Sequence, residues 1–140
     1  LVKWAVRKTD ATILREEEQW LEVPALSAVW MDKVELPQID CFNEYVSYEA
    51  WENDQIISQG TVIFSYPKYF RYLNPGLTVR VDGDEIVVKA EAYAKSVEIR
   101  NENDDLILED NYFDMNAEEY RVKILDGKPD GLKVRSVYDI

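Results

Sequence analysis

Histidine is absent from the 140 residues, and cysteine occurs once, at Cys41. Without histidine, neither a Ser-His-Asp triad nor a Cys-His pair can form, and the commonest metal ligand and general base is missing. A single cysteine excludes an internal disulfide and a paired-cysteine zinc site. The sequence also contains no glycine-rich phosphate-binding loop. We therefore expect no catalytic residue, no cofactor and no metal site in this chain.

Positive charge is scarce, because 16 basic residues stand against 28 acidic ones and give a formal net charge of −12. This balance repels phosphate backbones and anionic lipid head groups, so neither nucleic acid nor a membrane surface is an expected partner. Long apolar runs are also missing, and no segment approaches the roughly 20 residues that span a bilayer. Hydrophobic residues nevertheless make up 46% of the chain, which predicts a globular protein and not a disordered one.

Alternation of apolar and polar residues dominates what is present. In Ile86–Ala92 the even positions are apolar, while Lys89 and Glu91 point the other way, as in a half-buried strand. The same pattern and a high content of β-branched and aromatic residues predict about ten strands. The other predicted strands lie at 2–6, 12–23, 27–34, 42–51, 55–64, 77–81, 97–99, 120–124 and 132–134.

The connections between these segments carry turn-forming residues, as in Glu52-Asn53-Asp54 and Asp82-Gly83-Asp84. All five prolines fall outside the alternating cores, where a missing N–H does not interrupt a sheet. No segment shows a sustained helical stripe, and 110–119 is expected to be a loop with a short turn. The predicted fold is an all-β, immunoglobulin-like antiparallel sandwich.

The segment Tyr66–Pro75 interrupts the pattern, because two prolines bound it and it is rich in aromatic residues. We interpret it as a connector between two small packed sandwich units, at 1–66 and 67–140, whose aromatic side chains fill the seam between them. The alternative is a sugar-stacking platform that could also include the four tryptophans. The residues concerned in the connector are Tyr66, Tyr69, Phe70 and Tyr72.

Carboxylates are plentiful and raise two further possibilities. Neighbouring pairs or triplets such as Glu16-Glu17-Glu18 alternate faces on a strand or splay from a loop, so we expect solvated surface and not a glycosidase acid pair. The runs 110–114 and 126–131 partly match calcium loops. Hydrogen-bonded turns, in which Asp and Asn side chains close their own backbone, are the favoured interpretation of both runs.

Three motifs, Tyr66–Pro75, Ala92–Ile99 and Glu109–Met115, together resemble the C-terminal end of glycoside hydrolase family 2 enzymes of the β-mannosidase type. The resemblance implies two immunoglobulin-like domains at the end of a string of β-domains around a catalytic barrel. The segment 66–140 would be the terminal domain, and 1–65 would be most of the preceding one. Leu1 already lies in a strand-like segment without a leader, so we expect a piece of a longer parent.

By this resemblance the parent hydrolyses β-mannosidic or related links with two barrel glutamates, and no position in this chain matches their motifs. The chain would then be non-catalytic, with the remainder of the parent as its intramolecular partner. It would support the barrel and could lend a loop to the active-site rim. One alternative is a carbohydrate-binding module that uses exposed aromatic residues on an oligosaccharide. Another is a cell-surface adhesion module, which predicts tandem repeats that this chain does not contain.

If Phe70 fills a buried seam, Phe70→Ala should lower the free energy of unfolding by about 3 kcal/mol or more, the range for emptying a buried aromatic site. Chemical denaturation of the wild-type and variant chains measures the difference. A loss below roughly 0.5 kcal/mol would mean that Phe70 is exposed, and would favour the sugar platform.

Overall fold

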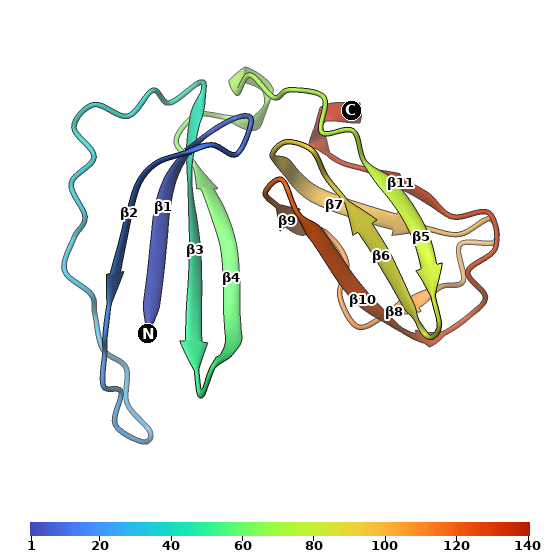
Figure 1. Ribbon diagram of the computed structural model, residues 1–140, viewed down its shortest axis with the longest axis horizontal. Coiled ribbons are helices and arrows are strands. Elements are labelled where there is room, and N and C mark those ends of the chain that lie inside the picture. The colour runs from blue at the N-terminus through green and yellow to red at the C-terminus, as the bar shows by residue number, and fades with distance from the viewer. The chain divides into compact units, whose positions relative to one another are not determined.

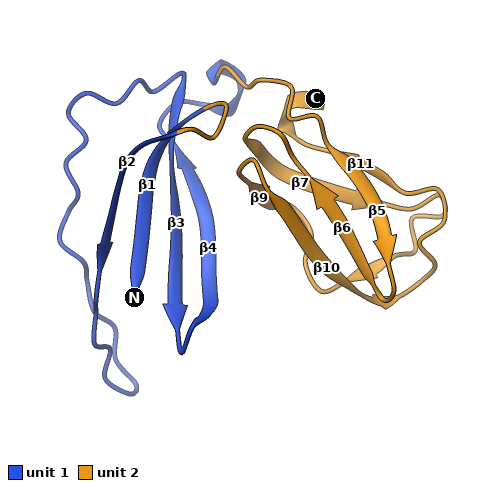
Figure 2. Ribbon diagram, viewed as in Figure 1, with its two compact units in different colours: residues 1–8, 13–70 blue, residues 9–12, 71–140 orange.

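The computed structural model describes residues 1–140 as two compact units (Figures 1 and 2). Unit 1 comprises 1–8 and 13–70, and unit 2 comprises 9–12 and 71–140. Strands dominate both units, and the only helical turns are the short 3-10 segments η1 (Pro67–Tyr69) and η2 (Val137–Asp139). None of the helical segments has the length and apolar content needed to cross a membrane. The predicted all-β class with two units is confirmed.

Unit 1 is built on one four-stranded antiparallel sheet in the order β2-β1-β3-β4. The central strand β1 pairs with both β2 and β3, so that Ala5 lies opposite Glu16 on one side and Ser47 on the other. A two-residue turn joins β3 to β4, and both of its residues, Asn53 and Asp54, have positive φ, as a type I′ hairpin requires. The strand limits are β1 Val2–Lys8, β2 Ile13–Gln19, β3 Glu44–Glu52 and β4 Gln55–Ile63.

The two faces of this sheet differ in character because side chains alternate along each strand. Trp4 points to the apolar face, where the Arg15 guanidinium lies 5.0 Å from its ring centre. On the same face the ring of Tyr48 crosses Gly60 so closely that a Cβ there would stand 2.8 Å from the phenol oxygen. Any larger residue at position 60 would therefore displace the Tyr48 ring. The opposite face carries polar side chains from β1, β2 and β3, including Lys3, Glu16 and Glu49.

The strand predicted at 27–34 is wrong, and the strand predicted at 12–23 ends at Gln19. The whole stretch 20–43 forms no strand and appears in Figure 1 as the long connection from β2 to β3. A strand needs a partner whose N–H and C=O groups complete the ladder, and residues 27–34 have none in unit 1. Their apolar side chains consequently stay exposed.

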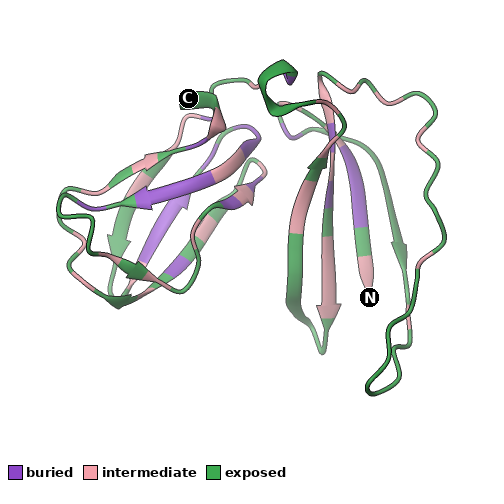
Figure 3. Ribbon diagram, turned by 180° about the vertical axis from the view of Figure 1, so that it is seen from behind, coloured by how far each residue is buried: buried purple, intermediate pink, exposed green.

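Unit 2 contains two sheets, one in the order β5-β6-β10-β8 and the other in the order β11-β7-β9. Both are antiparallel, and buried residues, purple in Figure 3, gather on the inner strands β6 and β7. The two short strands β8 and β9 were not predicted, and β9 lies inside the segment 110–119 that the sequence suggested to be a loop. The limits are β5 Thr78–Asp82, β6 Glu85–Lys89, β7 Ala94–Arg100, β8 Ile107–Leu108, β9 Phe113–Met115, β10 Glu119–Asp126 and β11 Lys133–Arg135.

The core of unit 2 is a single apolar cluster supplied by both sheets. Val122 on β10 and Ile86 on β6 are fully buried cross-strand neighbours, and Val97 on β7 faces Phe113 on β9. Because each sheet contributes one apolar face to this cluster, unit 2 has the two-layer construction of a β-sandwich. The buried members are Ile86, Val88, Ala90, Ala94, Val97, Ile99, Phe113, Met115 and Val122.

Candidate functional site

The four connector aromatics have different environments. Tyr66 and Tyr69 are 74% and 54% exposed, whereas Phe70 is 5% exposed. The rings of Tyr66 and Tyr69 meet edge to face, with centroids 6.3 Å apart and an interplanar angle of 72°. The Lys68 ammonium lies 4.8 Å from the Tyr69 ring centre. The structure thus brings two of the four side chains together at the surface and buries a third.

Tyr72, the fourth of these aromatics, belongs to unit 2 and is partly buried. Its ring stacks on the fully buried Tyr93, with centroids 6.0 Å apart and an interplanar angle of 27°. Burial, together with the negative charge of Asp114, raises the pKa of Tyr72 to about 12. The phenol is therefore neutral at physiological pH and contributes mainly by packing.

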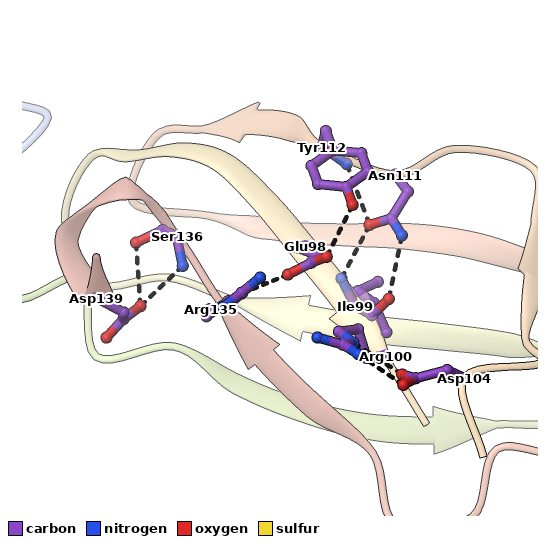
Figure 4. A network of polar contacts seen from close by, with 9 residues as sticks. All are labelled: Glu98, Ile99, Arg100, Asp104, Asn111, Tyr112, Arg135, Ser136 and Asp139. Carbon is purple, nitrogen blue, oxygen red and sulfur yellow. Dashed lines mark hydrogen bonds and ion pairs between the residues drawn. The ribbon is translucent and has the colours of Figure 1, made fainter. Parts of the chain in front are cut away.

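A polar network on the outer side of the β11-β7-β9 sheet was not predicted from the sequence (Figure 4). At its centre the Glu98 side chain on β7 is largely buried. Tyr112, just before β9, donates its hydroxyl to Glu98 Oε1 at 2.7 Å. Arg135 on β11 donates from Nε to Glu98 Oε2. One carboxylate therefore links β7 to β11 and to the residue that immediately precedes β9.

Side-chain hydrogen bonds from Asn111 and Arg100 extend the network along β7. The Asn111 side chain accepts from Ile99 N at 2.9 Å and donates to Ile99 O at 3.1 Å, so it continues the ladder where β9 has not yet begun. Tyr112, the next residue, has φ +63°, a left-handed conformation that is unusual for an aromatic residue. Further along, the Arg100 guanidinium makes two bonds to the Asp104 carboxylate, at 2.8 and 2.6 Å.

The two acidic runs that partly match calcium loops bond in different ways, and of Asp114 and Asp126 only Asp126 closes its own backbone as the favoured interpretation predicts. Asp114 accepts from Ser96 N at 2.8 Å and from the Lys95 ammonium at 3.1 Å. Asp126 accepts from Gly127 N at 2.8 Å. No cluster of three or more Asp, Glu, Cys or His side chains is placed to hold a metal ion. Asp126 thus closes a local turn, whereas Asp114 on β9 binds the neighbouring strand β7.

The environment of Glu98 favours a structural role for the network. The hydrogen bond from Arg135, then that from Tyr112, lowers the pKa of Glu98. A glycosidase general acid needs the opposite shift, a raised pKa that keeps the carboxyl protonated near neutral pH. Both Glu98 oxygens are also engaged by these two partners. Glu98 is therefore suited to holding strands together and not to proton transfer.

We predict that Glu98→Gln destabilises the chain at neutral pH and that its cost shrinks in acid. The lowered folded-state pKa means that ionised Glu98 stabilises the fold above its unfolded pKa of about 4.3 and loses this effect as pH falls through the folded value. Urea unfolding of both chains at pH 7 and at acidic pH measures the difference. The exposed Glu102→Gln is the matched control, and a pH-independent gap for Glu98→Gln would contradict the prediction.

Two family models together match almost the whole chain. The Mannosidase Ig/CBM-like domain matches residues 1–69, and the Ig-fold domain of the Ig_mannosidase family matches residues 72–140. No curated protein sequence matches this chain.

Among solved structures, the crystal structure of the β-D-mannosidase from Dictyoglomus thermophilum is similar, with a TM-score of 0.73 and 18% sequence identity. The similarity covers 96% of this chain and 18% of that enzyme's chain, and at this identity it shows the fold alone. The two domain matches and this shared fold confirm the resemblance to a β-mannosidase. The chain therefore belongs to the mannosidase immunoglobulin-like domains, of the kind that forms the C-terminal region of family 2 glycoside hydrolases.

Proposed function

We propose that this chain is a non-catalytic accessory region that packs against the remainder of a β-mannosidase-like retaining glycosidase and supports its catalytic barrel. The observation that carries the proposal is the large exposed apolar surface of unit 1. In the strand-free stretch 20–43, Trp20, Leu26 and Trp30 are 76%, 108% and 94% exposed. Three large apolar side chains that are this exposed within one connection are a feature expected of an interaction site.

The free energy gained by burying these tryptophan side chains supports the proposal that they are covered in the parent protein. Burying one large aromatic side chain removes about 150–250 Å² from water. At about 25 cal/mol per Å², that is roughly 4–6 kcal/mol per tryptophan before the ordering costs of association. Two nearly free tryptophans in one connection are therefore a strong driving force for packing against a neighbouring body. If the neighbouring body belongs to the same polypeptide, packing against it avoids most of the entropy cost of bringing two separate molecules together.

A loop at the rim of the active-site pocket is a second part of this proposal. It would come from the same accessory region and requires no catalytic group here. The alternative, a carbohydrate-binding module that uses Tyr66 and Tyr69, is less well supported, because a 72° angle between the two rings prevents them from forming one flat stacking surface. Nucleic acid does not fit the net charge of −12.

Two measurements test the proposal. The purified chain should release no chromophore from a chromogenic β-mannoside, and clear hydrolysis would refute a non-catalytic role.

Trp30→Ala should leave the stability of the isolated chain within about 0.5 kcal/mol, because the side chain is 94% exposed. In the full-length parent the same substitution should lower the Tm by several degrees, of the order that about 2 kcal/mol produces. An unchanged Tm there would mean that this side chain packs against nothing.

A further inference from the structure

A hollow of about 370 Å³ lies on the polar face of unit 1, across strands β2, β1 and β3. Its floor is formed by two small side chains, Ala5 on β1 and Ser47 on β3, which lie directly opposite each other in the sheet. Both residues are buried, at 6% and 7% exposure. Longer side chains surround this floor, so the hollow results from small residues at the centre of a sheet face and large ones at its edge.

The surrounding side chains place donors on the middle strand and acceptors on the strands to either side of it. Lys3 and Arg7 on β1 are donors, while Glu16 and Glu18 on β2 and Glu49 on β3 are acceptors. The side chains of Glu16 and Glu18 make no hydrogen bond or ion pair within the chain, so their carboxylate oxygens are available to a ligand. Glu17 also belongs to the lining, so two cations stand against four carboxylates, and the resulting local charge of −2 disfavours an anionic ligand.

Contacts within unit 1 hold the side chains of Arg7, Glu49 and Lys3 in place around the hollow. Arg7 Nε donates to Ser47 Oγ at 2.9 Å. Trp51 donates its indole N–H to Glu49 Oε2 at 2.8 Å, and the Lys3 ammonium lies 5.2 Å from the Trp51 ring centre. An ordered set of polar side chains around a shallow floor requires little rearrangement when a ligand binds.

We infer that this hollow binds a neutral saccharide. Neighbouring hydroxyl groups of a sugar both donate and accept hydrogen bonds, and they can pair with carboxylate oxygens and with lysine or arginine donors at once. The volume lies within the usual range of about 300–1,000 Å³ for small-molecule pockets. This site is separate from Tyr66 and Tyr69. It also goes beyond the proposed supporting role, which needs no ligand.

The strand β2 itself provides a matched control. Glu17 stands between Glu16 and Glu18 in the sequence, but its carboxylate bonds to Arg15, whose guanidinium covers Trp4 on the apolar face. Glu17 belongs to the lining of the hollow, but its carboxylate is already bonded, so substituting it removes the same charge from the same strand and leaves the carboxylates of Glu16 and Glu18 in place.

The test is a ¹⁵N-NMR titration of the full 140-residue chain with mannobiose, mannotriose and cellotriose. Binding should shift the amide signals of Ala5 and Ser47 and the indole N–H signal of Trp51. The inference is overturned if no sugar shifts these signals at millimolar concentration. It is equally overturned if the shifts map onto Tyr66 and Tyr69, or if only a cationic probe such as spermidine binds.

Substitutions in the lining test whether the hollow itself is the binding site. Glu16→Gln combined with Glu18→Gln should weaken sugar binding about tenfold or more, the effect of losing charge-assisted hydrogen bonds. Ala5→Leu should abolish binding by filling the floor, whereas Glu17→Gln should leave the affinity unchanged. Dispersed amide spectra identify the variants that remain folded, and the two surface glutamine changes keep the test valid if Ala5→Leu does not fold. An equal loss for Glu17→Gln and for the double variant would contradict the assignment.

Discussion

The apolar core enclosed between the two sheets of unit 2 is the constraint on which the rest of that unit depends. Once Val97 and Ile99 point inward from β7, alternation forces Glu98 and Arg100 to the outer side of the same strand. The outward position of Glu98 then allows Arg135 and Tyr112 to meet on one carboxylate. The polar network is thus a consequence of the core, and it fixes strands that are too short to hold a sheet on backbone bonds alone.

Unit 1 is organised differently, because one sheet cannot enclose a core. Its apolar face keeps Trp4 covered by Arg15, but Trp20 and Trp30 remain almost fully exposed in the connection that follows β2. Its polar face holds the hollow floored by Ala5 and Ser47. Unit 1 therefore presents two different surfaces, an apolar one in the connection 20–43 and a polar one on the sheet, and our two proposals assign a separate role to each.

Sequence patterns predicted the class of fold and most long strands, because alternation over five or more residues is a local property, as in β6 and β10. They failed where structure depends on distant partners. Residues 27–34 have strand-like composition but no neighbouring strand, and β9, with only three residues, is too short to show a pattern. Glu98 and its partners lie 14 and 37 residues apart, so no motif could reveal them. The contrast between exposed Tyr66 and buried Phe70 likewise comes from tertiary packing.

Amide hydrogen exchange of the full chain is the most direct test of the claim that unit 2 has a closed core and unit 1 has a single sheet. Protection follows the free energy of the opening that exposes each amide, so the core strands should exchange last and as a group. The account predicts the slowest exchange for β6, β7 and β10, with faster exchange throughout β1 to β4. Amides of β1 and β3 that exchange as slowly as those of β6 and β10 would contradict it.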